Sequence, residues 1–322
     1  GMGDPAADLP RLIGARTEER KHRRRVVARL LLQAGVIDRA AVDARRRAGL
    51  QAAVLEWQIT QAVGETNRRF IAGTAARERI LRKLIGFEES HLIEVGRPQV
   101  DVDYPAPPLP RDGRTVVLFA PTWEGDRASM RYSSVESHGP ALVRSLLATG
   151  RHRVIYRPHP RTGIVLRSTK AAHDEIVRLI AAANKADASA GHVVDTSGGF
   201  GWQLSVSDVA VMDISAVAYD WLATAKPLLV TQPAEPRAQL PESGLVRELD
   251  LFTATDAARA ASVVDAAVTQ PDESHAALVR RYFGDTTPGA SMARFLDACD
   301  DVIRERSAAL AARSGTTSTG RG

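Results

Sequence analysis

Residues 115–120, TVVLFA, are apolar or β-branched at every position and carry no charge. An unbroken run of this length is typical of a strand covered on both faces, as in a parallel sheet. Four more short runs rich in apolar residues follow along the chain. They are HRVIYRP at 152–158, HVVDTS at 192–197, DVAVMD at 208–213 and PLLVTQP at 227–233. Together these runs predict five strands.

Patterns typical of helices lie between and after these strands. We expect helices at 140–148, 166–183, 202–206, 216–224, 257–268, 274–282 and 288–312. Strands that alternate with helices at this spacing predict an α/β fold with a doubly wound parallel sheet. Ligands of such sheets bind at the carboxyl ends of the strands, so the residues that follow each strand are the candidates for a functional site.

The composition divides the 322 residues into four parts. Residues 1–96 are expected to form a helical, basic N-terminal region, with helix from 11 to 85, where proline is absent. Residues 97–113 contain five prolines and predict a linker. Residues 114–312 would be the α/β domain, and the Ser-, Thr- and Gly-rich residues 313–322 a disordered tail.

Positive charge is concentrated in one segment. The formal net charge of the chain is +5, but residues 11–47 alone hold twelve basic against four acidic residues. This segment suggests docking on an anionic membrane surface, with nucleic acid as a competing partner and a solvated helical face as the plain alternative. No known nucleic-acid-binding motif accompanies the segment, so no specific nucleic acid is expected.

The remaining composition excludes several classes of protein. A chain with 44% hydrophobic and 25% charged residues is neither disordered nor a small disulfide scaffold. Cys299 is the one cysteine, so no disulfide can form within the chain and a reducing compartment is expected. No apolar run approaches membrane-spanning length. No cluster of His, Cys and carboxylates has the spacing of a structural zinc site.

The first two strand exits carry polar and basic groups. The loop after 115–120 holds Thr122, Trp123 and two acids, and a packed surface loop is its plain alternative. The second exit, RPHPR at 157–161, sets a histidine between two arginines. Arginine forks suit phosphate oxygens, and a histidine can donate to phosphate or move a proton. A basic turn with a capping histidine is the alternative to a phosphate site here.

The third and fourth exits are rich in small residues. DTSGG at 195–199 has hydroxyls and glycines that let a ligand approach the backbone, although taken alone the segment fits a plain turn better. After the fourth strand come Asp213 and then Ser215, the expected N-cap of a helix that begins near Ala216. Free N–H groups and the positive helix end make such a position an anion cradle, whereas ordinary capping needs no ligand.

In this order, the exits resemble those of the CDP-glycerol glycerophosphotransferase family, which contains teichoic-acid primases and polymerases. The resembling motifs are A-P-T-W at 120–123, R-P-H-P at 157–160, D-T-S at 195–197, D-I-S-A at 213–216 followed by Asp220, and K-P at 226–227. Segments at 95–101, 282–285 and 289–294 resemble the family's linker and closing motifs. The resemblance covers about residues 70–300.

The resemblance implies a GT-B architecture, in which two Rossmann-like lobes face a cleft and the C-terminal lobe holds CDP. It implies that an acceptor hydroxyl attacks the β-phosphate of CDP-glycerol and that CMP leaves, so catalysis is mainly positioning and charge neutralisation. His159 and Arg157 would be the catalytic residues. The residues implied in donor binding are Thr122, Trp123, Arg161, Asp195, Thr196, Ser197, Asp213, Ser215, Ala216 and Asp220. No residue is assigned to a metal, although Mg²⁺ on the pyrophosphate is compatible with the site.

The chain departs from the family's pattern in three places. The family's W-H-G motif, whose histidine is the expected general base, is absent. Glu124 stands where the family has an arginine, and Ala216 where it has a second serine. Two alternatives stay open: a GT-B glycosyltransferase that uses another nucleotide sugar, and a non-catalytic lobe that binds nucleotide or lipid and regulates a partner.

The resemblance also suggests partners and a location. The expected partners are CDP-glycerol or a related CDP donor, a lipid-linked or polymer acceptor, an anionic membrane surface contacted by residues 11–47, and other copies of the chain in a homo-oligomer. The expected location is the cytoplasm, at the inner face of the bacterial membrane.

Overall fold

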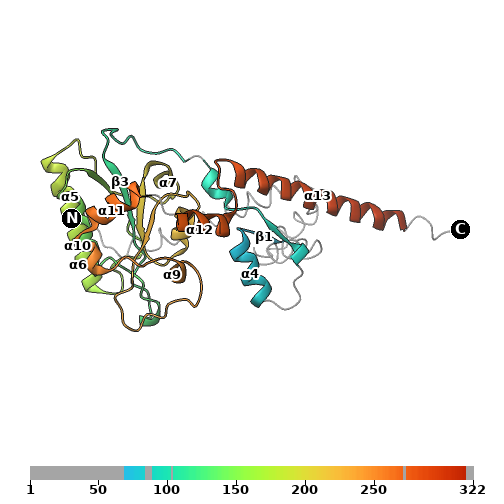
Figure 1. Cartoon of the computed structure of the whole chain (residues 1–322), viewed down its shortest axis with the longest axis horizontal. Coiled ribbons are helices and arrows are strands. Elements are labelled where there is room, and N and C mark those ends of the chain that lie inside the picture. The colour runs from blue at the N-terminus through green and yellow to red at the C-terminus, as the bar shows by residue number, and fades with distance from the viewer. Residues whose placement is uncertain (1–68, 84–88, 103, 271–272, 317–322) are drawn as a thin grey trace, which may run out of the picture. The chain divides into compact units, whose positions relative to one another are not determined.

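The computed structural model describes residues 69–83, 89–102, 104–270 and 273–316. The chain divides into two compact units (Figure 1). The second unit comprises Ala72–Ile80 and Glu94–Arg294 and contains every candidate site residue named above. The basic segment 11–47 lies outside the described residues.

The first unit includes the described parts of Gly1–Ile71, Leu81–Ile93 and Phe295–Gly322. Strands β1 (Arg69–Ile71) and β2 (Leu92–Glu94) form a two-stranded sheet, and the 3₁₀ turn η1 (Glu89–His91) leads into β2. Phe70 meets Phe295 edge to face, with ring centroids 5.7 Å apart.

Within the helix expected from 11 to 85, the structure describes residues 69–83, and only some of them are helical. Residues 74–83 are helical, as α4 (Thr74–Lys83), but residues 69–71 form strand β1. The sequence of β1, RFI, includes an aromatic and a β-branched residue, which favour a strand when a partner is available. Residues 11–68, 84 and 85 of that expected helix lie outside the described part of the chain.

The second unit is built on a five-stranded sheet of order β5-β4-β3-β6-β7 in which every pair is parallel. The strands are β3 (Thr115–Ala120), β4 (His152–Tyr156), β5 (Val193–Val194), β6 (Val209–Met212) and β7 (Leu228–Val230). All five expected strands are confirmed, and the first has the expected bounds. The chain runs outward from β3 to β5 and then returns to the other side of β3. The carboxyl ends of β3 and β6 therefore flank the topological switch point, where doubly wound sheets bind ligands.

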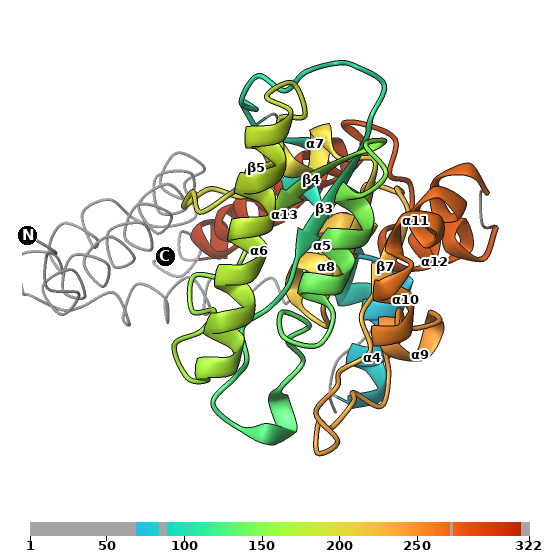
Figure 2. The same cartoon turned by 90° about the vertical axis from the view of Figure 1, so that its left-hand side faces the viewer.

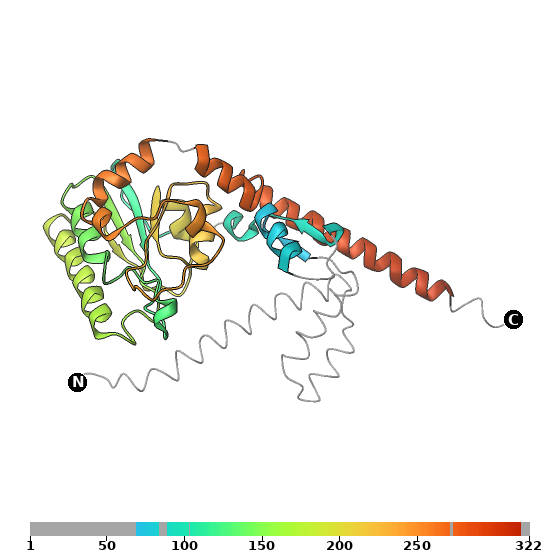
Figure 3. The same ribbon diagram turned by 60° about the horizontal axis from the view of Figure 1, so that its bottom comes forward.

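Helices cover both faces of this sheet. On one face lie α5 (Gly139–Leu147), α6 (Arg167–Ala186), α10 (Ala254–Ala258) and α11 (Ala260–Thr269). On the other lie α7 (Trp202–Val206), α8 (Ala216–Leu222), α9 (Leu245–Glu248) and α12 (Glu273–Phe283). Figure 2 shows α5 and α6 in front of the sheet, and Figure 3 shows these green helices together on one side.

Alternation along β3 explains why both faces are covered. Val117 and Phe119 join the core under α5 and α6, whereas Val116, Leu118 and Ala120 join the core under α8 and α12. Successive side chains of a strand point to opposite faces, so a strand apolar at every position needs a cover on each side. The α/β class and the doubly wound sheet are thus confirmed.

Some helix boundaries differ from expectation. The helix expected at 257–268 is two helices, α10 and α11, which meet at the non-helical residue Arg259. A capping box of Thr253 and Asp256 starts α10 earlier than expected. The C-terminal helix α13 (Ala290–Thr316) extends into the expected tail, so residues 313–316 are helical and not disordered. The linker contains a 3₁₀ turn, η2 (Pro98–Asp101), with proline at its start.

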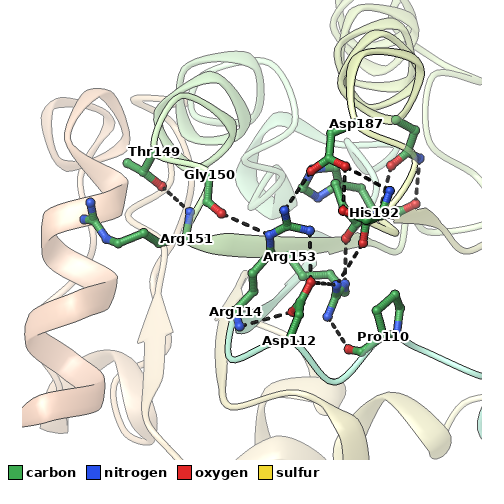
Figure 4. Close-up of polar contacts among 12 residues, drawn as sticks. Pro110, Asp112, Arg114, Thr149, Gly150, Arg151, Arg153, Asp187 and His192 are labelled. Carbon is green, nitrogen blue, oxygen red and sulfur yellow. Dashed lines mark hydrogen bonds and ion pairs between the residues drawn. The ribbon is translucent and has the colours of Figure 1, made fainter.

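A buried arginine attaches the end of the linker to the amino-terminal edge of the sheet (Figure 4). Arg153 on β4 is 1% exposed. Its guanidinium donates to the carbonyls of Pro110 and Ala190, at 2.6 and 2.7 Å, and to the Asp112 carboxylate at 2.8 Å. Because these acceptors satisfy the buried cation, the linker is held at the edge opposite the strand exits.

Candidate functional site

Asp213 joins three strand exits from inside the protein. It follows β6 directly and is fully buried. Its carboxylate accepts hydrogen bonds from the backbone N–H of Thr122 at 2.7 Å, the backbone N–H of Ser134 at 3.1 Å and the Thr231 hydroxyl at 2.5 Å. Burial raises the pKa of Asp213 from 3.8 to about 6. The exits of β3, β6 and β7 are therefore fixed to one another through a single carboxylate.

Arg157, Asp195 and Ser197 come together across the exits of β4 and β5. The Arg157 guanidinium donates to the Asp195 carboxylate and, at 3.2 Å, to the Ser197 carbonyl. Asp195 also accepts from the Gln203 side chain and from the Ser197 backbone N–H. Burial would raise the pKa of Asp195, but the hydrogen bonds from Ser197, Gln203 and Arg157 outweigh it, and the pKa is lowered.

Trp123, His159 and Arg161 form a second group across the exits of β3 and β4. The rings of Trp123 and His159 are stacked, with centroids 6.2 Å apart. The Arg161 guanidinium carbon lies 3.6 Å from the centroid of the Trp123 ring, a distance that permits a cation–π contact. His159 Nδ1 accepts a hydrogen bond from the Arg161 backbone N–H at 3.1 Å. In the neutral imidazole, this bond assigns the ring proton to Nε2, which is then a donor.

Both arginines of the site are paired with carboxylates. Arg157 is 16% exposed and is engaged by Asp195. Arg161 is 39% exposed and forms a 3.3 Å ion pair with Asp126, which is itself largely exposed. An incoming anion would therefore find Arg161 easier to reorient than Arg157.

Glu124, which the sequence analysis noted only as a departure from the family's pattern, is a further functional candidate. It follows Trp123 and is 2% exposed. Its carboxylate accepts from the backbone N–H groups of Gly163 at 3.0 Å, Val165 at 2.8 Å and Leu166 at 3.2 Å. Burial would raise the pKa of Glu124, but these backbone bonds prevail and the pKa is lowered. The sequence signal was the acid in place of the family's arginine.

Ser215 is the N-cap residue of α8, as expected, with extended backbone. Its side chain makes no capping bond, and its Oγ is a buried oxygen without a hydrogen-bond partner among the described residues. Ala216, the first residue of α8, is exposed, and so is Thr196 after β5. These residues follow β5 and β6 at the same end of the sheet.

Asp220 belongs to a different contact. It accepts from Arg97 Nε at 2.6 Å and from the Gln99 side chain at 3.4 Å, both in the linker segment. The same segment reaches the start of α13, where Asp101 accepts from the backbone N–H groups of Gly289 at 3.0 Å and Met292 at 2.8 Å. The motifs at 95–101 and 289–294 are thus brought together with α8.

The K-P motif has a structural use as well. Lys226 Nζ donates to the carbonyls of Leu204 and Ser207, each at 2.8 Å, at the C-terminal end of α7. A lysine at the negative end of a helix satisfies carbonyls that have no partner within the helix. Several motifs that resemble the family therefore hold this unit together.

Two features are absent among the described residues. No group of three or more His, Cys, Asp and Glu residues among them is arranged to hold a metal ion. No helix in the described ranges is long and apolar enough to cross a membrane.

The fold and the site define a Rossmann-like α/β unit with basic and hydroxyl groups at the carboxyl ends of its parallel strands. The family model of CDP-glycerol:poly(glycerophosphate) glycerophosphotransferases matches residues 18–235. The chain belongs to this family. A search of the curated proteins found no match.

The structure is similar to that of the wall teichoic acid polymerase TagF, with a TM-score of 0.50 and 17% identity over 80% of this chain and 63% of TagF. A histidine-to-asparagine variant of TagF, soaked for 30 minutes with CDPG, gives a TM-score of 0.50 and 16% identity, covering 80% of this chain and 62% of that one. These likenesses support the GT-B-like fold. The chain spans about three fifths of the length of TagF.

Proposed function

We propose that this chain transfers glycerol phosphate from CDP-glycerol to a hydroxyl of a cell-wall or lipid-linked acceptor, in the synthesis of a teichoic-acid-like polymer. The observation that carries the proposal is the presence of Arg157, Ser197, His159 and Arg161 at the carboxyl ends of the neighbouring strands β4 and β5, beside Trp123 at the end of β3. Arginine, hydroxyl and imidazole groups together suit a pyrophosphate. Membership of the family supports the choice of donor.

In the proposed reaction, the acceptor oxygen forms a bond to the β-phosphorus of the donor. The bond from that phosphorus to the bridging oxygen breaks, and the bridging oxygen leaves with CMP. The acceptor hydroxyl gives up its proton to a base that we assign to no described residue. Charge develops on the phosphoryl oxygens and the leaving group, so cationic and N–H donors aimed at them lower the barrier.

His159 and Arg157 have separate parts in this scheme. With its proton on Nε2, His159 donates to a phosphoryl oxygen and neutralises developing charge. Arg157 is held by Asp195 and Ser197, so its guanidinium is already oriented before the donor arrives. Arg161 exchanges its weak contact with Asp126 for a donor phosphate.

The other candidate residues bind the donor around this centre. The Thr122 backbone N–H is held by Asp213. The Ser215 hydroxyl, which has no hydrogen-bond partner among the described residues, would donate to phosphate or glycerol oxygens. Thr196 and Ala216 are exposed at the same edge of the sheet. Mg²⁺ on the pyrophosphate would add charge neutralisation, and its need is tested by adding a chelator.

We further propose that the acceptor is met at the inner face of the bacterial membrane, with the chain in the cytoplasm. The net charge of residues 11–47 supports attraction to anionic lipid. Flotation with vesicles of phosphatidylglycerol, in low and high salt, tests this: binding lost in high salt supports it, and no binding in low salt contradicts it.

The release of CMP from CDP-glycerol, measured chromatographically with a glycerophosphate-primed lipid acceptor, tests the function itself. We expect His159→Ala and Arg157→Ala to lower the rate at least about a hundredfold, as for loss of a group that stabilises the transition state. Arg144→Ala, which removes an exposed arginine of α5, is the control and keeps the rate. Faster turnover of a UDP-sugar would favour the glycosyltransferase alternative. Nucleotide binding without turnover would favour the regulatory lobe.

A further inference from the structure

The turn at residues 163–166 connects the R-P-H-P-R exit of β4 to α6. Its backbone is shaped by two hydrogen bonds, from Thr162 N–H to the His159 carbonyl at 2.8 Å and from Ile164 N–H to the Arg161 carbonyl at 3.3 Å. Gly163 has a φ of +77°, and a Cβ there would lie 2.8 Å from the Cα of Lys170. The turn therefore has one compact conformation that ordinary side chains at Gly163 would disturb.

The Glu124 carboxylate fills the inside of this turn. Oε1 accepts from Val165 and Leu166, and Oε2 accepts from Gly163. Leu166 is the N-cap residue of α6, whose side chain cannot cap the helix. The carboxylate thus satisfies backbone N–H groups at and before the start of a 20-residue helix, where a negative charge is also favoured by the helix dipole.

The same carboxylate belongs to the residue next to Trp123. Two neighbouring residues therefore contact the same exit. Trp123 carries the ring against which His159 and Arg161 lie, and Glu124 binds the turn that follows them. An arginine at position 124, as in the family's motif, would direct N–H donors at three backbone N–H donors. The anionic side chain is what this turn requires.

We propose that Glu124 is a positioning residue, which holds the 163–166 turn so that His159 and Arg161 stay against Trp123. The effect of Glu124 on donor affinity rests on the proposed function. Its hydrogen bonds to the 163–166 turn do not. In this account the cation that the family has at position 124 is supplied by Arg161, whose guanidinium lies 3.6 Å from the neighbouring Trp123 ring.

The test compares Glu124→Gln with the full-length wild type by amide hydrogen exchange and by donor titration. Glutamine keeps an oxygen for Val165 and Leu166 but turns an amide N–H₂ toward the Gly163 N–H. We expect the protection of the Gly163 amide to fall about ten- to a hundredfold, the loss of one charge-assisted hydrogen bond. The dissociation constant for CDP-glycerol should rise about tenfold, with the KM for the acceptor unchanged. Glu175→Gln on α6 is the matched control and changes neither.

Several outcomes would overturn the proposal. The proposal fails if Glu124→Gln changes neither the protection of the Gly163 amide nor the affinity for the donor. It also fails if the Gly163, Val165 and Leu166 amides exchange fast in the wild type. The latter measurement keeps the test decisive even if the variant does not fold. Tighter donor binding by Glu124→Arg would mean that position 124 contacts the donor directly. If the wild type binds no CDP-glycerol, the proposed function fails, while the exchange result still decides the role of Glu124 in the turn.

Discussion

Replacement of Asp213 tests the hydrogen bonds that join the strand exits. Asp213→Ala leaves the buried backbone N–H groups of Thr122 and Ser134 without their acceptor. Each buried donor left unsatisfied costs about 1–3 kcal/mol, so the free energy of unfolding should fall by about 2–6 kcal/mol. A domain of this kind is stable by about 5–15 kcal/mol in total, so the loss is large.

Asp213→Asn separates the charge of this carboxylate from its hydrogen bonds. The amide oxygen can still accept from the backbone, and the amide N–H₂ can donate to the Thr231 hydroxyl. The pKa of Asp213 is raised from 3.8 to about 6, so the folded state binds the proton more tightly than the unfolded state. This contribution to stability is complete below pH 4 and is lost as the pH rises through 6. Asparagine has no such dependence.

Urea denaturation of the wild type, Asp213→Ala and Asp213→Asn at pH 4.5 and 7.5 measures both effects. The wild type should lose about 2 kcal/mol relative to Asp213→Asn between these pH values. Asp250→Asn, at an exposed position, is the control and should follow the wild type at both. A loss below 1 kcal/mol in Asp213→Ala, or a difference between wild type and Asp213→Asn that does not change with pH, would refute this reasoning.

Two further changes test the linker. Arg153→Ala removes a buried cation that holds the linker through Pro110 and Asp112. The free energy of unfolding, measured by urea denaturation, should fall by about 3–5 kcal/mol. A fall of less than about 0.5 kcal/mol would contradict this role of Arg153. Asp220→Asn weakens the 2.6 Å pair with Arg97, and should lower stability by about 1 kcal/mol with CDP-glycerol affinity kept within twofold, as measured calorimetrically. A tenfold loss of affinity would instead assign Asp220 to donor binding, as the family resemblance implies.

The strand pattern could be predicted because it depends on short-range features. Residues 115–120 are apolar throughout, and burial on both faces is the one environment that suits such a run. Helix α7 has the expected bounds, 202–206. Strand β1 was missed because three residues carry too weak a pattern without their partner β2. The early start of α10 depends on a capping box that the periodicity of apolar residues does not reveal.

The site could be predicted only in part. The sequence placed Arg157, Asp195 and Ser197 after neighbouring strands, and a parallel sheet brings such residues together. It could not predict that Asp220 faces Arg97, because that contact joins residues 123 positions apart. The role of Glu124 was equally hidden, since it depends on three backbone N–H groups of a distant turn.

Calorimetric titration of the wild type and of His159→Ala with CDP-glycerol, with CDP and UDP-N-acetylglucosamine alongside, tests the central claim most directly. The account predicts that CDP-glycerol binds the wild type more tightly than the UDP-sugar does, and that His159→Ala weakens its binding at least about tenfold, the loss of a charge-assisted hydrogen bond of about 1.5–3 kcal/mol. Binding of CDP-glycerol that is equally tight in both proteins would contradict a donor site at His159, and binding of no nucleotide by the wild type would contradict the donor site altogether.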